Sequence, residues 1–241
     1  MKAIILCAGQ GRRLLPYTES SPKCLLSLAG KHFIEWQIDI LLSVGITKII
    51  AVVGYDAQRI ESLLTPKYLD KISFVYNPFY EIADNLASCW MAKEHFTNDF
   101  IILNGDTLFE PSIISTLLSK NEFSITLATD EKDGYDEDDM KVISEGSQLK
   151  SVGKKLPLDK VNGESIGIMH FNPEGARHFK QCIEASMYLP ESLQKWYLSI
   201  IDKLASDNQV GICSIHGHEW TEVDFVQDLE RAQTLAEKWS K

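Results

Sequence analysis

The chain has 241 residues, of which 44% are hydrophobic and 24% charged, and its formal net charge is −10. This composition is typical of a globular protein, and the length predicts one domain. A net acidic surface repels a phosphate backbone, which argues against a general nucleic-acid binder. A locally basic cleft can still bind a small anion.

The cysteines and the N-terminus narrow the class further. The five cysteines are odd in number and widely spaced, and they form no Cys-x-x-Cys pair, which argues against a disulfide framework or a structural zinc site. No apolar run reaches the roughly 18 residues that span a bilayer. The run from Ala3 to Ala8 is short and is followed at once by glycine and two arginines. We therefore expect a first β-strand rather than a signal peptide, and a cytoplasmic protein.

Apolar runs alternate with amphipathic segments over residues 1–129. Continuous apolar runs predict strands that are buried on both faces, and apolar residues at helical spacing predict helices. The expected strands are Lys2–Cys7, Lys48–Val53, Ile72–Tyr76, Phe100–Leu103 and Phe123–Thr129. The expected helices are Phe33–Val44, Ala57–Leu64, Asn85–Phe96 and Pro111–Leu118.

The alternation stops after residue 129. Three short segments, Lys141–Ser144, Leu149–Val152 and Ser165–Phe171, read as hairpin-type strands added to the sheet. Helices are expected at Glu174–Ala185, Glu191–Ala205 and Val226–Trp239, with a last strand at Val210–Ile215. The pattern predicts an α/β fold, a Rossmann-like three-layer sandwich with a mixed, mainly parallel sheet. Ligands of such sheets bind at the carboxyl ends of the parallel strands.

A glycine loop, Ala8 to Pro16, follows the first strand. Glycines at such a place let backbone N–H groups approach phosphates. Leu14 stands where a dinucleotide fingerprint has its third glycine, and the Gly-Lys-Ser/Thr of a P-loop is absent. A plain tight turn is the remaining alternative. The cations Arg12, Arg13 and Lys23 near the loop, in a chain of net charge −10, favour a polyphosphate clamp.

Gly-x-Gly-x-Arg-Leu at residues 9–14, followed by Pro22-Lys23, resembles the start of the sugar-phosphate nucleotidyltransferase superfamily. The resemblance implies a fold of the nucleotide-diphospho-sugar transferase type, with Arg13 and Lys23 as catalytic residues. Arg12 replaces the usual small hydroxyl residue, and no role is assigned to its charge. The nucleotide-binding residues it implies are Leu6, Ala8, Gly9, Gly11, Arg12, Arg13, Lys23, Asn85, Ser88 and Gly105.

Two aspartates are candidate metal ligands. By themselves, Asp106 reads as a turn residue and Asp224 as a turn residue or helix cap. In the resembled family, an aspartate after the fourth strand and an acidic or amide residue near the C-terminus jointly bind Mg²⁺, which implies Asp106 and Asp224 as ligands. Glu222 is an alternative ligand. His216 and His218 are either a His-x-His zinc pair or part of a surface loop.

Two further segments resemble the bacterial phosphocholine cytidylyltransferase branch: Asp84 to Ala92, and Asp138 to Val142 with Gly163 to Ile168. The branch implies Mg²⁺-dependent transfer of CMP from CTP to a small phospho-acceptor such as phosphocholine, or a related phospho-amino-alcohol or phosphonate. The acceptor-binding residues it implies are Asp84, Trp90, Lys141, Lys154, Glu164 and Trp220. Residues in these segments also have purely structural interpretations. Asn85 can cap its helix, and Asp136–Asp139 can be a solvated loop. The tryptophans, with Tyr80 and Tyr135, can be core or rim aromatics, and the two lysines can be exposed strand residues.

The expected organisation is a single domain over 1–241, with a nucleotide-binding half at 1–129 and an acceptor-binding half with a closing helix at 130–241. The expected partners are a nucleoside triphosphate and a small phosphorylated acceptor, with no nucleic acid and no membrane span; a homodimer is compatible with the sequence. Two other functions stay open: a sugar-1-phosphate nucleotidyltransferase that uses UTP, dTTP or GTP, and a noncatalytic nucleotide-binding regulatory protein.

Overall fold

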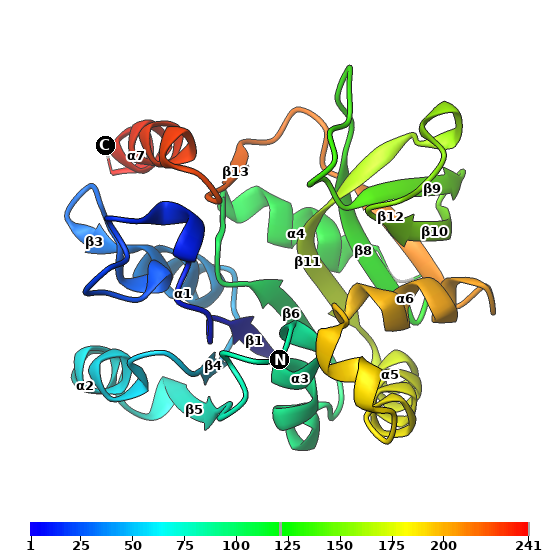
Figure 1. The fold of residues 1–241 in the computed structure, drawn as a ribbon. Helices are drawn as coiled ribbons and strands as arrows, with labels where there is room; N and C mark the ends of the chain where they lie inside the picture. Colours follow the sequence, from blue (N-terminus) through cyan, green and yellow to red (C-terminus); the bar gives the residue numbers. More distant parts are fainter. Residues whose placement is uncertain (121, 241) are drawn as a thin grey trace.

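A nine-stranded sheet runs through the computed structural model, which describes residues 1–120 and 122–240 (Figure 1). From one edge the strands are β5 (Ile72–Tyr76), β4 (Lys48–Val53), β1 (Lys2–Leu6), β6 (Phe100–Asn104), β11 (Gly163–Phe171), β8 (Ile125–Asp130), β12 (Val210–Ser214), β10 (Gln148–Gly153) and β9 (Lys141–Glu145). Strands β5, β4, β1 and β6 are mutually parallel, as are β8 and β12, whereas β11 and β10 run the other way. The predicted mixed, mainly parallel sheet is confirmed.

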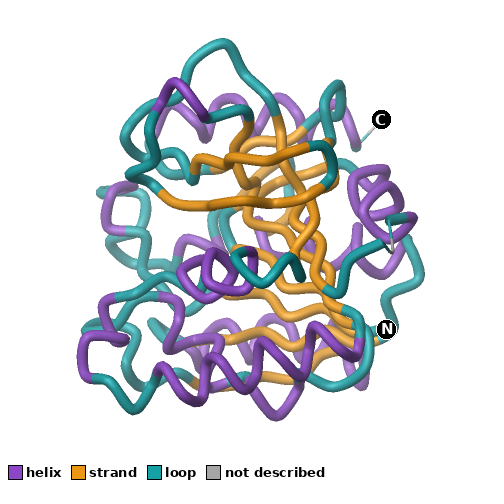
Figure 2. Tube along the Cα trace, turned by 90° about the vertical axis from the view of Figure 1, so that its right-hand side faces the viewer, coloured by secondary structure: helices purple, strands orange, loops and turns teal. Residues whose placement is uncertain are grey.

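Helices cover both faces of this sheet, because alternate residues of each central strand are apolar on opposite sides (Figure 2). Along β1, Ala3 and Ile5 pack with α1 (Phe33–Ser43), α2 (Ala57–Tyr68) and α4 (Pro111–Ser119). Ile4 and Leu6 pack with α3 (Asn85–Met91), α5 (Pro173–Ser186) and α6 (Leu198–Ala205). The C-terminal α7 (Val226–Trp239) covers the outer side of α1 through a third, smaller core. The layers follow from strands that are buried on both faces.

Short elements complete the chain. Two small sheets pair β13 (Trp220–Glu222) with β7 (Thr107–Phe109), and β2 (Ser27–Leu28) with β3 (Lys31–His32). The 3-10 helices are η1 (Arg12–Leu14), η2 (Lys23–Leu25), η3 (Leu69–Lys71), η4 (Lys93–His95), η5 (Leu158–Lys160) and η6 (Pro190–Gln194). None of the four short strands was expected from the sequence, because segments of two or three residues carry too little pattern.

The expected helix Glu191–Ala205 is wrong in its first half. The segment forms η6, then an extended stretch, and α6 begins only at Leu198. The backbone carbonyls of Leu193 and Lys195 accept the N–H groups of Asp84 and Leu86 at the start of α3. This tertiary contact keeps the stretch out of a helix, and it satisfies α3 donors that no side chain caps.

Three smaller differences concern the ends of two helices and the place of one strand. The expected helix Asn85–Phe96 ends as an α-helix at Met91 and continues as η4, and α2 runs past Leu64 to Tyr68 with Pro66 in its last turn. Strand β11, expected as a hairpin-type addition to the sheet, lies in its middle between β6 and β8, and its first residues also pair with β9.

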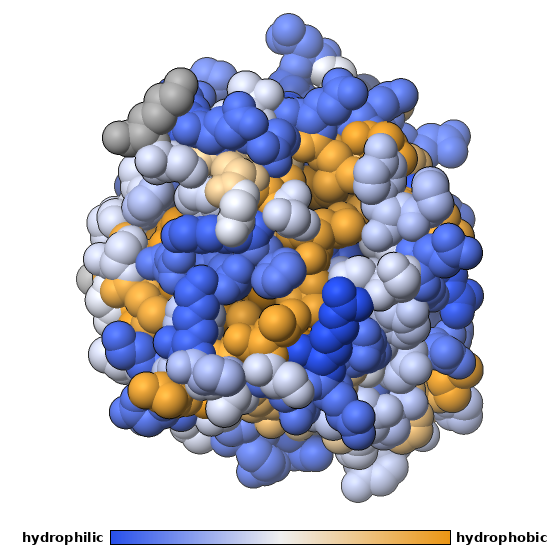
Figure 3. All heavy atoms as spheres, turned by 90° about the vertical axis from the view of Figure 1, so that its left-hand side faces the viewer, coloured by the Kyte–Doolittle hydropathy of each residue, from blue (hydrophilic) through white to orange (hydrophobic). Residues whose placement is uncertain are grey.

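Helix hydropathy, surface side chains and cysteine pairing were each expected from the composition of the chain. Within the described residues, no helix combines the length and hydropathy that crossing a membrane requires. On the face shown in Figure 3, apolar side chains form an irregular band between polar ones. All five cysteines are free thiols in the structure, and four of them are buried.

Candidate active site

The turn after β6 places Asp106 beside the end of β1. The Gly105 N–H donates to the Leu6 carbonyl at 2.9 Å. A side chain at Gly105 would lie 2.7 Å from that same oxygen and 2.8 Å from Cys7 Cβ, so only glycine lets the two strand ends approach. The predicted meeting of the glycine loop and the Asp106 turn is thereby built into the backbone.

The β7–β13 pair brings the C-terminal acidic residues to Asp106. Glu222 is paired with Thr107, and the Val223 N–H donates to the Asp106 carbonyl at 3.0 Å. Asp224 follows, and the Asp228 side chain accepts its N–H at 2.9 Å. One carboxylate oxygen each from Asp106, Glu222 and Asp224 thus lies within 4.8 Å of the others.

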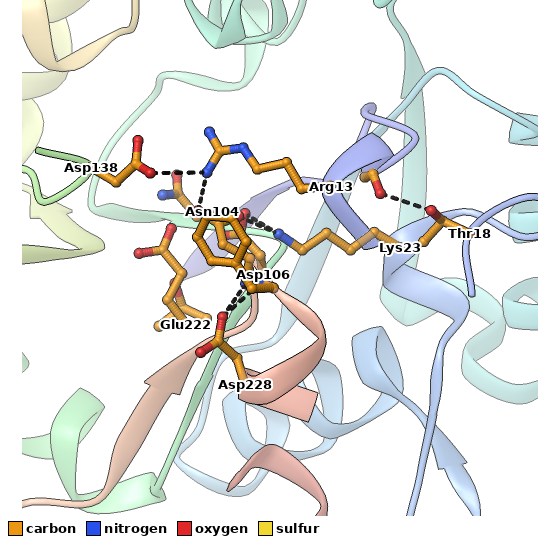
Figure 4. Close-up of polar contacts among 12 residues, drawn as sticks. Arg13, Thr18, Lys23, Asn104, Asp106, Asp138, Glu222 and Asp228 are labelled. Atoms are coloured by element: carbon orange, nitrogen blue, oxygen red, sulfur yellow. Dashed lines mark hydrogen bonds and ion pairs between the residues drawn. The ribbon is translucent and has the colours of Figure 1, made fainter. Parts of the chain in front are cut away.

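Lys23 and Arg13 reach this cluster from the glycine-loop side (Figure 4). Lys23 Nζ lies 2.9 Å from Asp106 Oδ2 and 2.9 Å from Asp224 Oδ1. Arg13 lies 3.0 Å from Asp224 Oδ2. Gly11, with φ of 80°, allows this approach, because a Cβ there would lie 2.7 Å from Lys23 Cβ. The glycine loop therefore positions the lysine as well as the backbone N–H groups.

The charges of the cluster are coupled. Burial opposes the charge on Lys23, but the carboxylates of Asp106 and Asp224 outweigh it and raise the pKa of Lys23. Loss of solvation in the cleft, followed by repulsion from Asp106 and Asp224, raises the pKa of Glu222 to about 8. Glu222 is therefore mostly protonated at neutral pH, and a divalent cation bound beside it would favour its ionised form.

The carboxylate cluster fits a hard divalent cation. Asp106 Oδ1 is buried and has no hydrogen-bond partner among the described residues, and a buried acceptor of this kind calls for a ligand. Carboxylate oxygens are the donors that Mg²⁺ prefers, and one or two of them suffice when phosphates and waters complete the shell. Asp106 and Asp224, with Glu222, are therefore suited to hold such an ion.

A cavity of about 290 Å³ lies beside the glycine loop. Its lining includes five of the expected nucleotide-binding residues: Leu6, Ala8, Gly9, Asn85 and Ser88. Ser88 accepts a hydrogen bond from Asn77 Nδ2 at 3.0 Å, and Asn85 Oδ1 accepts the Tyr197 N–H at 2.9 Å. Asn85 therefore holds the α6 segment rather than capping its own helix. Arg12 instead borders a neighbouring cavity of about 460 Å³.

Two of the expected acceptor residues, Asp84 and Trp90, have different surroundings. Asp84 lines the cavity beside the glycine loop, and burial raises its pKa although Lys154 opposes the shift. Trp90 packs against the core, with Lys93 Nζ 4.1 Å from its ring centroid, and does not line either cavity beside the glycine loop.

The indole that lines the cavity beside the glycine loop is Trp196. No sequence pattern indicated it, because its loop is placed there by the backbone contact with α3. Asn77, also in the lining, directly follows β5 and was detectable by the strand-end rule.

A further cavity, of about 320 Å³, is lined in part by Glu222 and Asp224 of the carboxylate cluster. Its charged lining is mostly acidic and its aromatic lining is Trp220 and Phe225; the acidic residues are Asp130, Asp136, Asp138, Asp139, Glu164, Glu222, Asp224 and Asp228. Trp220 Nε1 donates to Asp130 at 2.7 Å, which orients the indole. Burial raises the pKa of Glu164, although Lys132 pairs with it at 2.9 Å. This acidic cavity is suited to a cationic group.

The two expected acceptor lysines differ in their surroundings. Lys141 is buried, and its Nζ donates to the backbone carbonyls of Asp136, Asp139 and Lys154, so it organises the acidic loop. Lys154 Nζ lies 3.0 Å from Asp138 and 4.7 Å from the Trp196 ring centroid. Lys154 therefore contacts one residue of the acidic cavity, Asp138, and one of the cavity beside the glycine loop, Trp196.

The histidines do not form a zinc pair. His218 Nδ1 lies 2.6 Å from Glu110, whereas the exposed His216 faces Asp130 at 3.7 Å. In the described part of the chain, the carboxylate trio is the one cluster with metal-ligand spacing.

Comparison with known proteins identifies the family of the chain. Residues 3–148 match the family model of the MobA-like NTP transferase domain. A choline-phosphate cytidylyltransferase of Streptococcus pneumoniae is 28% identical over 238 residues, 98% of each chain. A CTP:phosphoglutamine cytidylyltransferase of Campylobacter jejuni is 26% identical and covers 95% of this chain and 98% of its own.

Solved structures share the fold. An inositol-1-phosphate CTP transferase from T. maritima superposes with a TM-score of 0.85 at 21% identity and covers 100% of this chain and 96% of its own. A CTP:phosphocholine cytidylyltransferase from Streptococcus pneumoniae gives a TM-score of 0.80 at 24% identity and covers 97% and 98%. The chain belongs to the MobA-like NTP transferase family and is a nucleotidyltransferase.

Proposed function

We propose that this protein transfers CMP from CTP to a small phosphorylated acceptor that also carries a cationic group, such as phosphocholine or a related phospho-amino-alcohol or phosphonate, and releases pyrophosphate. The observation that carries this proposal is the pairing of Lys23 with two aspartates. Asp106 directly follows Gly105, which is hydrogen-bonded to Leu6 of the glycine-loop cavity, and Asp224 lines the acidic cavity. The choice of CTP rests on the two full-length relatives named for cytidylyl transfer.

The chemistry needs positioned charge rather than a general base. An acceptor phosphate oxygen attacks the α-phosphorus in line; the new P–O bond forms as the bond to the β-phosphate oxygen breaks. A phosphomonoester has its second pKa near ~6, so this nucleophile is already ionised at neutral pH. The difficulty is bringing two anions together, which Arg13 and Lys23 relieve by neutralising charge and fixing geometry.

Mg²⁺ is the proposed cofactor, held by Asp106 and Asp224 with Glu222 beside them. When bound, it supplies neutralisation of the triphosphate charge. With the ion on Asp106 and Asp224, these carboxylates would hold Lys23 less tightly, and its Nζ could pair with the phosphates. A cytoplasmic location, where nucleoside triphosphates are abundant, forms part of the proposal.

The acidic cavity supports a cationic acceptor group. Trp220 offers a ring face and Glu164 a carboxylate in the same cavity, and such a combination binds an ammonium. A sugar phosphate lacks this positive charge and gains nothing from the acidic lining.

The test measures pyrophosphate release with Mg²⁺ while CTP, UTP, ATP, GTP and dTTP are crossed with phosphocholine, phosphoethanolamine, aminoethylphosphonate, inositol phosphate and hexose 1-phosphates. We expect release with CTP and a cationic acceptor, loss in Asp106→Asn, and retention in Asp207→Asn, an exposed control with the same charge change. Release only with a hexose phosphate would reject the acceptor class and keep the reaction. No release with any pair from the folded protein, with nucleotide still binding, would reject the reaction in favour of a binding role.

A further inference from the structure

Asp138 lies between two cations that come from opposite sides of the cleft. Its Oδ1 is 3.0 Å from Lys154 Nζ, and its Oδ2 is 3.8 Å from Arg13 Nη1. Arg13 belongs to the glycine loop, where it lies in η1, and Lys154 directly follows β10. Figure 4 shows the Asp138 carboxylate facing the guanidinium of Arg13, on the side away from Lys23. A single carboxylate therefore occupies the space between a residue of the nucleotide side and one of the acceptor side.

The acidic loop holds Asp138 in this place. Asp136 Oδ1 accepts the N–H groups of Asp138 and Asp139 at 3.0 and 3.3 Å. Lys141 Nζ ties the carbonyls of Asp136 and Asp139 to that of Lys154. The loop and Lys154 thus share one anchor, and the pairing of Asp138 with Lys154 follows from how the loop is built.

The exposed fractions of the three side chains show that Asp138 can leave the ion pairs more easily than Lys154 can. The side chain of Asp138 is 53% exposed and that of Arg13 48%, whereas that of Lys154 is only 19% exposed. Lys154 and, more weakly, Arg13 lower the pKa of Asp138, so the carboxylate is ionised at neutral pH. Asp138 regains full hydration when it swings outward, while the more enclosed Lys154 needs another anion in its place.

We propose that Asp138 is a displaceable counter-ion, which occupies the position between Arg13 and Lys154 that a phosphate or diphosphate group of the substrates takes, and which thereby sets the affinity of the enzyme for these anions. The inference rests on the proposed function for the identity of the anion. Exposed ion pairs contribute about 0.2–1 kcal/mol each, so the loss of two changes affinity by roughly twofold to thirtyfold, and by about threefold to tenfold for pairs of intermediate strength.

The test compares Asp138→Asn with Glu137→Gln. Glu137 is the adjacent residue, its substitution removes the same charge, and within the described residues it forms no ion pair. Inorganic pyrophosphate is titrated into each folded protein by calorimetry, and folding is checked by thermal melting. We expect pyrophosphate to bind Asp138→Asn about threefold to tenfold more tightly than the wild type, and Glu137→Gln within about twofold of it.

A second variant separates a counter-ion from a structural residue. In Asp138→Asn combined with Lys154→Met, the gain in affinity is expected to disappear, because the cation that was released is gone. If Asp138→Asn does not fold, Asp138→Ser replaces it in the same comparison.

Unchanged or weaker binding in the Asp138 variant, an equal gain in Glu137→Gln, or no pyrophosphate binding by any variant would overturn the proposal. Because this titration requires no transfer reaction, tighter binding by a protein that fails the substrate panel supports the counter-ion while rejecting the proposed reaction.

Discussion

Lys23 Nζ lies 2.9 Å from Asp106 Oδ2, although the two residues are 83 positions apart. The same nitrogen lies 2.9 Å from Asp224 Oδ1, a further segment 201 positions away. Each residue comes from a different connection at the carboxyl edge of the sheet, and the glycines at 11 and 105 allow the close approach. The cluster is thus preorganised by the backbone before any substrate arrives.

Replacing Lys23 by methionine is expected to reduce turnover at least about 100-fold, the scale on which one preorganised electrostatic group acts. Methionine keeps most of the aliphatic volume, so the loss reports the charge. Initial rates of pyrophosphate release measure it, with the surface variant Lys203→Met as control. Turnover within about threefold of wild type would remove Lys23 from the mechanism.

The same variant tests the metal site. Without Lys23, the carboxylates of Asp106 and Asp224 face each other with less compensation, and a divalent cation has more charge to neutralise. Mg²⁺ is therefore expected to raise the melting temperature of Lys23→Met more than that of the wild type, and EDTA to reverse the shift. Equal shifts in the two proteins would place Mg²⁺ away from these carboxylates.

Two glycines of one loop are expected to behave differently. Gly11→Ala forces a side chain into a left-handed conformation and against Lys23 Cβ, so stability falls by about 1–2 kcal/mol and turnover falls with it. Around Gly9 there is open space, so Gly9→Ala is expected to keep wild-type stability. Any loss of nucleotide affinity in Gly9→Ala then reports the approach of a ligand to the backbone. Urea unfolding and nucleotide titration measure both effects; equal stability losses would contradict the assignment.

The sheet and the edge that carries the site could be predicted from the sequence, because continuous apolar strands and strand-end glycines are local signals. Asp106 follows such a strand, whereas Asp224, with Glu222 as the alternative, could be proposed as its partner only from the family resemblance. Trp196 could not, since carbonyls that bond to the start of α3 place its loop. The central position of β11 also escaped prediction: β11 is a long, fully buried strand, but its neighbours are chosen by tertiary packing rather than by its own pattern.

Glu35 is expected to make stability depend on acid pH. Burial opposes its ionisation, but hydrogen bonds from Lys67 Nζ and the His32 N–H outweigh burial and lower the pKa of Glu35 below its usual 4.5. A carboxyl group with a lowered pKa in the folded state stabilises the fold above pH 4.5, and this contribution is lost as the pH falls through the folded-state value.

Glu35→Gln is therefore expected to cost about 1 kcal/mol at pH 7 and much less at pH 3. Urea unfolding at the two pH values measures the difference, with the exposed Glu191→Gln as a control that changes little at either. A cost that is the same at pH 3 and pH 7 would show that packing, not charge, is what Glu35 contributes.

Trp196, which no sequence pattern indicated, is expected to contribute to nucleotide binding, and Trp90 to the stability of the core. The ring of Trp196 lines the cavity at the glycine loop and is 40% exposed, so it can stack on a base at little cost to the fold. Trp196→Ala is expected to weaken CTP binding about tenfold, the scale of one base–aromatic contact, with stability nearly unchanged. Trp90 packs on the core beneath Lys93, so Trp90→Ala is expected to lower stability and leave CTP affinity unchanged. CTP titration and urea unfolding of both variants measure this crossed pattern. If Trp90→Ala instead weakened CTP binding while still folding normally, the nucleotide would have to lie on the other side of α3.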